Sequence, residues 1–504
     1  MASFGIHLGA DYSCVARIGE TGQPEIIKNV FGEHTTPSVV YFEDPTNVVV
    51  GREAKACAAR HPDLVVSRAQ RQMGRSVEIL AHGRRHSPES ISALILGELA
   101  QDAADASGEE VSDVVITVPA YFGVSAREAT RKAGAIAGLN VLAIVDEPVA
   151  AALHYDAGGT RTLLVYHLGG DGFAAAVVRV SPEEIRVVSM DGEYGLGGAD
   201  WDEMLVADLV ERFQAGHPGS RAADDEEFRR ELAAGAEDIR KQLGGVESCR
   251  FTARFAGDVS EIEVTRADFE DRTYHLLART LTITERTFRA AMERGVPGFD
   301  EVVLAGDAVR MPGVASGLES LFGVPLRMHE PELAVAKGAA RYALIESIDG
   351  ATVEGVARLH NDPGKRITTV VPRAVGIKII ERVEVHDAAS RARSKSSRVS
   401  FPIVHLLRAG TPLPARTEAL RFLTAYPDQA EILVEIWEQA SSIESDRPED
   451  NEHIVDCVIG GLPPLPLGSP VEVTFEMETG GLLRARAVEL VTGADLHVEL
   501  QFQG

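Results

Sequence analysis

Two short stretches of the sequence combine glycines with a histidine and an aspartate in the same order. The first is GIHLGADYSCVA, from Gly5 to Ala16, and the second is VYHLGGDGFAAAV, from Val165 to Val177. Each begins as an apolar strand and runs into glycines, a pattern typical of a hairpin whose backbone N–H groups hold an anion. The pattern predicts two phosphate-holding loops, yet each has a histidine at its head and an aspartate in its turn.

A third loop of this type is AGDAVRMPGV, from Ala305 to Val314, which follows an apolar strand and precedes AVAKGAARYAL, an expected helix. Two hairpins that face each other across a cleft would clasp the phosphates of a nucleotide. The third loop and a helix would then hold the base.

The composition limits the class of protein. The chain has 504 residues, of which 45% are apolar, so it is expected to form several cores in three or four domain-sized units. It has no apolar run long enough for a membrane span and no signal-peptide pattern, so we expect a cytoplasmic protein. A formal net charge of −26 argues against nucleic acid and against an anionic membrane as partners.

The four cysteines are scattered and lack the spacing of a zinc site. This spacing favours free thiols in a reducing compartment. The four are Cys14, Cys57, Cys249 and Cys457.

The first 345 residues or so alternate between strand-like and helix-like stretches. Expected strands include Val114 to Val118, Thr162 to Tyr166 and Glu301 to Gly306, and expected helices include Ser125 to Gly138 and Asp225 to Leu243. This alternation predicts an α/β domain.

From about Pro372 the sequence changes to short β-type runs, such as Glu431 to Trp437 and Val471 to Glu478, broken by Gly and Pro. A polar, breaker-rich stretch with the sequence NDPGKR separates the two halves. We therefore expect an α/β domain over residues 1–348, a linker over 349–371 and an all-β domain over 372–504.

Several longer segments carry a resemblance to a known family. ITVPAYFGVSAREATRKAGAIAGLNVLAIVDEPVAAALHY, LGGADWDEMLV, VVLAGDAVRMPGV and, in the second half, GGLPPLPLGSPVEVTFEMETGGLL resemble the 70-kDa heat-shock chaperone (DnaK) family. The resemblance spans almost the whole chain. It implies an actin-like (ribonuclease H-like) nucleotide-binding domain of two lobes, with an insertion around residues 222–270. A β-sandwich that clasps extended peptides would follow.

The resemblance also implies which residues would contact a nucleotide and which would relay its binding. The relay positions are Pro119 and Arg127. The nucleotide positions, which we expect to bind weakly or to be vestigial, are Gly9, Ala10, Asp11, Gly169, Gly170, Asp171, Gly197, Gly198, Glu237, Arg240, Gly306, Asp307 and Arg310.

The catalytic positions depart from the family pattern. The hairpin heads that are aspartates in the family, where they orient hydrated Mg²⁺, are His7 and His167 here. The lysine that positions water is replaced by Gln70 and the threonine of the second loop by Gly172, whereas Glu147 is retained. Imidazole is a poor substitute for hard oxygen around Mg²⁺, so we expect ATP hydrolysis to be very slow or absent.

Three aspartates affect the expected affinity for a nucleotide. Asp11, Asp171 and Asp307 replace neutral residues of the family's loops, and Gly244 replaces an expected serine. If these carboxylates are uncompensated, they would repel bound phosphates at a cost of about a few kcal/mol. Tight ATP binding is therefore not expected.

The family's leucine-rich docking linker corresponds to GKRITT, in which Ile367 is the one bulky apolar residue. Since the sequence stops at Gly504, just after the expected β-sandwich, we also expect no helical lid. We therefore expect that ATP cannot drive cycles of peptide binding and release in this protein.

Three interpretations of the histidine pair stay open. The two rings could fill a site that has lost its activity, or they could belong to a weakly retained nucleotide site. They could also bind Zn²⁺ or Fe²⁺. The oxygen donors of such a metal site would come from Asp11, Asp171, Glu147 or Asp200.

Together these features predict a chaperone-like protein with impaired ATP hydrolysis that acts as a dedicated scaffold or stabiliser of a protein partner, for which a single enzyme is one candidate. A conventional ATP-dependent chaperone with weak ATPase activity is one alternative. A metal-binding protein or metalloenzyme that uses the His7 and His167 cleft is another.

Overall fold

The computed structural model describes residues 3–156, 158–349, 365–385, 396–440 and 444–499. These form two compact units. Unit 1 comprises residues 1–121 and 129–367, and unit 2 comprises residues 122–128 and 368–504. Each unit is described separately below.

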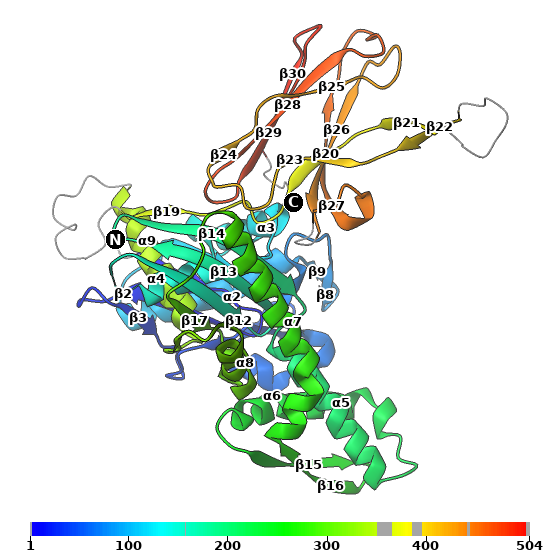
Figure 1. Cartoon of the computed structure of the whole chain (residues 1–504). Coiled ribbons are helices and arrows are strands. Elements are labelled where there is room, and N and C mark those ends of the chain that lie inside the picture. The colour runs from blue at the N-terminus through cyan, green and yellow to red at the C-terminus, as the bar shows by residue number, and fades with distance from the viewer. Residues whose placement is uncertain (1–2, 157, 350–364, 386–395, 441–443, 500–504) are drawn as a thin grey trace. The chain divides into compact units, whose positions relative to one another are not determined.

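Unit 1 contains two large sheets, each of which defines a lobe (Figure 1). The first lobe has the strand order β11-β10-β1-β2-β3, and β4 also pairs with β2. These strands are β1 (Phe4–His7), β2 (Tyr12–Ile18), β3 (Pro24–Ile27), β4 (Thr36–Pro37), β10 (Asp113–Val118) and β11 (Asn140–Asp146).

The second lobe has the strand order β18-β17-β12-β13-β14-β19. Its strands are β12 (Arg161–Leu168), β13 (Gly172–Val180), β14 (Glu184–Tyr194), β17 (Glu301–Ala305), β18 (Leu326–Arg327) and β19 (Arg366–Thr368).

The two sheets repeat one topology. In the first, β1 forms an antiparallel hairpin with β2 and a parallel pair with β10. In the second, β12 pairs in the same way with β13 and β17. Since both glycine loops connect the two strands of such a hairpin, they occupy equivalent places in the two lobes. The sequence revealed this repeat only as the paired hairpins.

Helices α4 and α9 lie side by side between these sheets (Figure 1). A Cβ atom on Gly338 of α9 would lie 1.7 Å from the carbonyl oxygen of Ala150 of α4, so only glycine permits this approach. The helices are α1 (Arg52–Cys57), α2 (Pro88–Ser107), α3 (Val124–Ile136), α4 (Glu147–Tyr155), α5 (Gly198–Gly216), α6 (Glu226–Leu243), α7 (Arg266–Glu293), α8 (Pro312–Phe322) and α9 (Ala334–Asp349).

Smaller sheets extend the two lobes. The first lobe carries β5 (Val39–Phe42), β6 (Val48–Val50), β7 (Val65–Ser67), β8 (Ile79–Ala81) and β9 (Arg84–His86). The second carries the hairpin of β15 (Ser248–Phe255) and β16 (Asp258–Thr265), which follows α6. These elements lie around the expected insertion, and α6 begins at the N-cap Asp225, whose side chain accepts a hydrogen bond from the Phe228 amide.

Unit 2 consists mainly of strands. One sheet has the order β23-β20-β26-β27, another β24-β28-β29-β30 with β25 also paired to β28, and one apolar core includes Ile377 and Ile436 from the first and Phe475 from the second. The strands are β20 (Val375–Lys378), β21 (Glu381–Val385), β22 (Ser396–Ser400), β23 (Ile403–Leu407), β24 (Ala415–Arg416), β25 (Leu420–Leu423), β26 (Ile432–Gln439), β27 (Asn451–Ile459), β28 (Pro470–Met477), β29 (Leu483–Glu489) and β30 (Asp495–Glu499).

The end of the expected linker joins the second lobe. Arg366 donates a backbone hydrogen bond to the carbonyl of Glu183, and β19 pairs with the edge strand β14. The neighbouring Lys365 forms an ion pair with Asp156, and both side chains are buried. The end of the expected linker is therefore anchored by a buried charge pair, which the apolar pattern of the segment does not indicate. The rest of NDPGKR lies outside the described residues.

The elements expected from the pattern are largely confirmed, with end shifts of a few residues. The expected strand from Val114 to Val118 is β10, and the expected helix from Ser125 to Gly138 is α3. Within the described residues, no helix combines the length and apolar character needed to cross a membrane.

Candidate functional site

His7 and His167 occupy equivalent positions on the two sheets. His7 is the last residue of β1, beside Thr117 of β10, and His167 lies near the end of β12, beside Ala305 of β17. Since strands end here in both lobes, the two side chains reach the cleft between them. Both line the same pocket.

One carboxyl group, that of Glu147 at the start of α4, lies between the two histidines. Its Oε1 is 3.7 Å from Nδ1 of His7, and its Oε2 is 3.3 Å from Nδ1 of His167. His7 Nδ1 is also 3.0 Å from Oγ1 of Thr117. The three side chains form a polar bridge from one lobe to the other.

Burial keeps this bridge uncharged at neutral pH. It raises the pKa of Glu147 to about 8, with a further contribution from Asp146. Burial lowers the pKa of His7 to about 4, and burial together with His7 lowers the pKa of His167 to about 3. The protonated carboxyl group of Glu147 and the two neutral rings therefore lie together without a net charge, and the hydrogen bond of His7 Nδ1 is with Oγ1 of Thr117.

This bridge predicts a stability maximum near pH 6.5. Between pH 4 and 6.5 the unfolded histidines bind protons that the folded ones do not, so stability rises with pH, and the two rings outweigh the single carboxyl group. From pH 6.5 to 8 folded Glu147 keeps a proton that the unfolded chain has lost, so stability falls. Urea unfolding of wild type and Glu147→Gln from pH 5 to 9 tests this.

Glu147→Gln keeps a neutral side chain and should lose the decline above pH 6.5. An identical decline in that variant would show that Glu147 is not its source.

The three loop aspartates are each paired with an arginine. Asp11 Oδ1 lies 2.8 Å from Nε of Arg68, and Asp307 Oδ2 lies 3.6 Å from a terminal nitrogen of Arg240. Asp171 forms an ion pair with Arg71. The condition of uncompensated carboxylates is therefore not met, because Arg68, Arg71 and Arg240 neutralise them, and of these the sequence analysis had singled out only Arg240.

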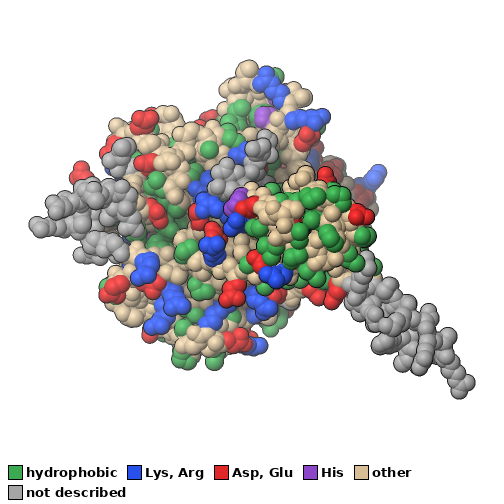
Figure 2. Space-filling view, turned by 90° about the horizontal axis from the view of Figure 1, so that it is seen from above, with side chains coloured by type: hydrophobic (Ala, Val, Ile, Leu, Met, Phe, Trp, Pro, Cys, Tyr) green, Lys and Arg blue, Asp and Glu red, His purple; other side chains and the backbone are tan. Residues whose placement is uncertain are grey.

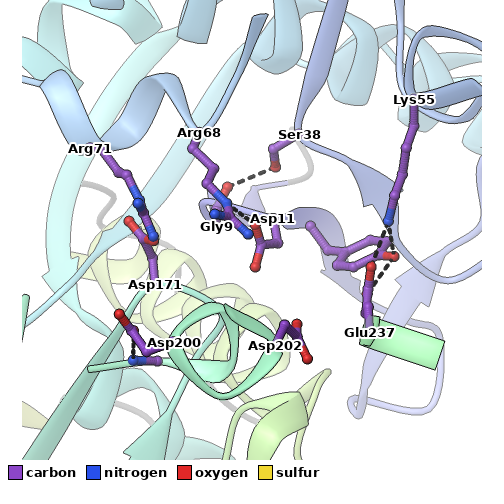
Figure 3. Close-up of polar contacts among 12 residues, drawn as sticks. Gly9, Asp11, Ser38, Lys55, Arg68, Arg71, Asp171, Asp200, Asp202 and Glu237 are labelled. Atoms are coloured by element: carbon purple, nitrogen blue, oxygen red, sulfur yellow. Dashed lines mark hydrogen bonds and ion pairs between the residues drawn. The ribbon is translucent and has the colours of Figure 1, made fainter. Parts of the chain in front are cut away.

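Two of these arginines come from the segment around Gln70, which is expected to stand in place of a lysine that positions water. Arg68 and Arg71 flank Gln70 in the turn that follows β7. Figure 3 shows the two arginines pointing toward Asp11 and Asp171. Gln70 itself is buried and donates a hydrogen bond to the carbonyl of Leu8. The sequence offered a signal for these ion pairs, because SRAQRQMGR places Arg68 and Arg71 on either side of Gln70.

Charged contacts join the lobes across the cleft. Arg71 of the first lobe pairs with Asp171 of the second (Figure 3). Glu237 of α6 accepts a hydrogen bond of 2.8 Å from the Tyr12 hydroxyl and lies 2.8 Å from Nζ of Lys55. Burial alone would raise the pKa of Glu237, but Lys241 and Lys55 lower it to about 2. Glu237, one of the expected nucleotide positions, therefore contacts side chains of the protein itself in this structure.

A tyrosine fills the space of the missing threonine. A Cβ atom on Gly172 would lie 2.4 Å from the hydroxyl oxygen of Tyr121, a first-lobe residue that follows β10. The Tyr121 ring also meets Tyr194 edge-on at 6.2 Å, and Arg71 lies over the Tyr194 ring at 5.7 Å. Aromatic contacts therefore accompany the charged ones across the cleft.

Gly172→Thr, which restores the family residue, is expected to destabilise the protein by about 1–3 kcal/mol, since the new side chain overlaps Tyr121. Tyr121→Ala in the same chain should recover part of this loss. Thermal unfolding of both variants measures the effect, and an unchanged melting temperature in Gly172→Thr would exclude the proposed overlap.

Polar groups of the glycine loops already have partners within the protein. The Gly9 amide donates to Oγ of Ser13, and the Gly169 amide donates to the carbonyl of Gly172. At the start of α5, the Gly198 amide donates to the carbonyl of Gly169, and Asp200 accepts from the Gly197 amide. These hydrogen bonds fix the backbone of the loops and join the second loop to the start of α5.

A pocket of about 390 Å³ remains in the cleft. Eleven of the predicted positions line it, together with Tyr12, Cys14, Gly244 and others. The eleven are His7, Gly9, Ala10, Asp11, His167, Gly169, Gly170, Arg240, Gly306, Asp307 and Arg310. Among the predicted positions that do not line it, Pro119 follows β10, and Arg127 of α3 donates a hydrogen bond from Nε to the carbonyl of Phe122.

The residues present fit Mg²⁺ with a nucleotide poorly. The two aspartates that would orient the ion are histidines, and the loop carboxylates and their arginines neutralise one another. A polyphosphate would therefore have to displace these carboxylates from their arginines.

The metal interpretation of the histidines stays a prediction. Since both Nδ1 atoms face Glu147, the Nε2 atoms are left as ligands, and Asp11 and Asp171 are engaged by arginines. Among the described residues, the group of three close potential ligands is instead Glu435, His453 and Asp456 in unit 2. Zinc titration of the wild type and of the double variant His7→Ala with His167→Ala tests the metal interpretation. Equal zinc binding by the two proteins would contradict it.

Comparison with protein-family models matches these observations. The model described as Hsp70 protein matches residues 3–81 and 76–360, which is most of the chain and includes both glycine loops and the pocket. The family has an actin-like, two-lobed ATPase fold, in agreement with the two repeated sheets of unit 1. The chain belongs to the 70-kDa heat-shock protein family.

Proposed function

We propose that this protein is a chaperone-like scaffold that binds a protein partner without an ATP cycle. Membership in the family supports a chaperone-like function, and proteins of the family generally bind protein clients. The observation that carries the proposal is the pairing of each loop aspartate with an arginine, which supplies negative charge where a nucleotide would bring its phosphates. Because side chains of the protein itself form the contacts between the lobes, no nucleotide is needed to hold the lobes together. The protein can therefore act as a scaffold without an ATP cycle.

A partner that binds only the folded scaffold, or is folded only when bound, is stabilised by mass action without hydrolysis. The expected stoichiometry is therefore one scaffold for each bound partner. We place the partner site on a β-sandwich domain over residues 372–504, linked to the nucleotide-binding domain by residues 349–371.

Exposed apolar side chains support this placement. Figure 2 shows hydrophobic side chains gathered on one face of unit 2. Large exposed residues of this unit include Leu423, Tyr426, Leu467 and Val491, which are between 51% and 64% exposed. Apolar groups of this size on a surface favour contact with another protein.

The pairing of strands brings several of these residues to one end of the second sheet. Leu423 pairs with Pro470, and the Leu490 amide, next to Val491, donates to the Pro470 carbonyl. The Gly468 amide donates to the carbonyl of Thr424, which places the loop containing Leu467 beside the same strand end. This end of the sheet is the surface we expect a partner to cover.

Affinity purification of the tagged full-length chain from its native cell tests the proposal. A partner present in stoichiometric amount should be retained during washes with MgATP, and Leu423→Ser with Val491→Ser should lose it. Val259→Ser, which alters an exposed valine of unit 1, is the matched control and should retain it. Release by MgATP, or no partner in stoichiometric amount, would contradict the proposal.

The alternative of a conventional ATP-dependent chaperone makes a different prediction. It requires measurable ATP hydrolysis in a single turnover that is abolished by Glu147→Gln. Our proposal predicts no hydrolysis above background in either protein.

A further inference from the structure

The hairpin of β15 and β16 in the second lobe packs against α5 (Figure 1). Its two-residue turn, 256–257, has positive φ angles at both positions, as tight hairpin turns require, and this turn fixes the register in which Asp258 begins β16. Because successive side chains of a strand point to opposite faces, Asp258, Ser260 and Ile262 share one face of β16. Ile262 is buried in the same core as Phe213 of α5, so this face is directed toward α5.

His217 lies at the C-terminal end of α5. It is the residue after the last helical position, and its backbone amide donates to the carbonyls of Phe213 and Gln214. Its ring packs on the buried ring of Phe213, with a distance of 4.7 Å between the ring centroids, and the His217 side chain is 24% exposed. The helix end and the core beneath it therefore fix the position of the imidazole.

The two ring nitrogens of His217 face two different side chains of β16. Nε2 lies 3.0 Å from Oγ of Ser260, and Nδ1 lies 3.7 Å from Oδ1 of Asp258. A carboxylate on the Nδ1 side favours the tautomer that carries its proton on Nδ1, so Nε2 accepts a hydrogen bond from the Ser260 hydroxyl group. Serine, histidine and aspartate therefore follow one another in the order used by enzymes with a serine nucleophile.

The Ser260 hydroxyl group lies beside an exposed glycine. Ser260 is half-buried and Gly216 is exposed. A Cβ atom on Gly216 would lie 3.4 Å from Oγ of Ser260, so the glycine keeps the space next to the hydroxyl oxygen free of a side chain. This arrangement leaves room for a small reagent to reach Oγ from solvent.

We propose that Ser260 is a nucleophile activated by His217, and that it accepts an acyl group from a small activated ester. The bond between Oγ and the acyl carbon forms and the ester C–O bond breaks, while the Oγ proton passes to Nε2 of His217 and then to the departing alcohol. Asp258 is a positioning residue that keeps Nε2 directed at Oγ. The site lies outside both the cleft and unit 2, so this activity is independent of the proposed scaffold function.

Incubation of the full-length protein with p-nitrophenyl acetate, followed by mass spectrometry of tryptic peptides, tests the proposal. Fragmentation of peptide 255–266 locates an acetyl group on Ser260, and peptide 242–250 reports Ser248, an exposed serine of β15 whose hydroxyl donates to Glu263. Ser260 should be acetylated at least about a hundredfold faster than Ser248, which is the low end of what a positioned general base contributes.

Three variants test the roles of the partners. His217→Gln should slow acetylation of Ser260 by about a hundredfold, and His275→Gln, at an exposed position of α7, is the matched control and should not change it. Asp258→Asn should slow it by about tenfold while the melting temperature stays that of wild type, as expected for a positioning residue.

Two results would overturn the proposal. One is acetylation of Ser260 no faster than that of Ser248 in the wild-type protein, a comparison that does not depend on the folding of any variant. The other is an unchanged rate in His217→Gln, since Ser260 would then react without a base.

Discussion

Arg71→Ala is expected to lower the free energy of unfolding by about 2–4 kcal/mol. The variant leaves the carboxylate of Asp171, which is only 6% exposed, without its cation in the cleft. Loss of one partner from a fully buried pair typically costs about 3–5 kcal/mol, and the effect should be somewhat smaller here because the Arg71 side chain is 26% exposed. The contact of Arg71 with the Tyr194 ring is lost as well. Urea unfolding measures the change.

A double variant separates the cost of the unpaired carboxylate from the cost of the lost packing. Asp171→Ala in the Arg71→Ala background removes the unpaired carboxylate and should recover more than half of the loss. Arg75→Ala, at an exposed position of the same loop, should change stability by less than about 0.5 kcal/mol. If the double variant were no more stable than Arg71→Ala, an unpaired buried charge would not be the cause.

Lys365→Ala is expected to cost about 3–5 kcal/mol, because Lys365 and Asp156 are 2% and 6% exposed and form a buried ion pair. The same pair fixes the start of β19, so the backbone hydrogen bond from Arg366 to Glu183 should also weaken. Urea unfolding gives the stability, and hydrogen exchange of the peptide that contains residues 365–371 gives the local effect.

Two further variants test whether the lost ion pair accounts for the effect of Lys365→Ala. Lys365→Met with Asp156→Asn removes both charges and retains an acceptor for the Gly158 amide, so it should be more stable than Lys365→Ala. Arg366→Ala, at the adjacent exposed position, is the control and should unfold like wild type. Equal stability of Lys365→Ala and wild type would show that the pair does not anchor the linker.

The parts of the site that were predictable from sequence are local in origin. The glycine loops follow from apolar strands that run into glycines, and β1, β12 and β17 all end at such loops. The pairing of His7 with His167 followed from the repeated pattern, because equivalent positions in two repeats face a shared cleft. Glu147 was expected near them from the resemblance, and the structure places its carboxyl group between the two rings.

The charge balance was not predictable in the same way. Arg71 and Asp171 are 100 positions apart in the sequence and meet only because the two lobes close on one another. No periodicity links such residues, so their pairing depends on tertiary structure. The Lys365 and Asp156 pair was missed for the same reason, since the linker was judged by its apolar content alone.

We propose that the protein's own side chains, rather than a nucleotide, hold the two lobes together across the cleft. Hydrogen exchange of the full-length protein with and without millimolar MgATP tests this most directly, through peptides that cover residues 8–13 and 168–173. We predict that exchange in these loops is unchanged by MgATP and becomes faster in Arg71→Ala. Slower exchange of the wild-type loops on addition of MgATP would contradict the claim.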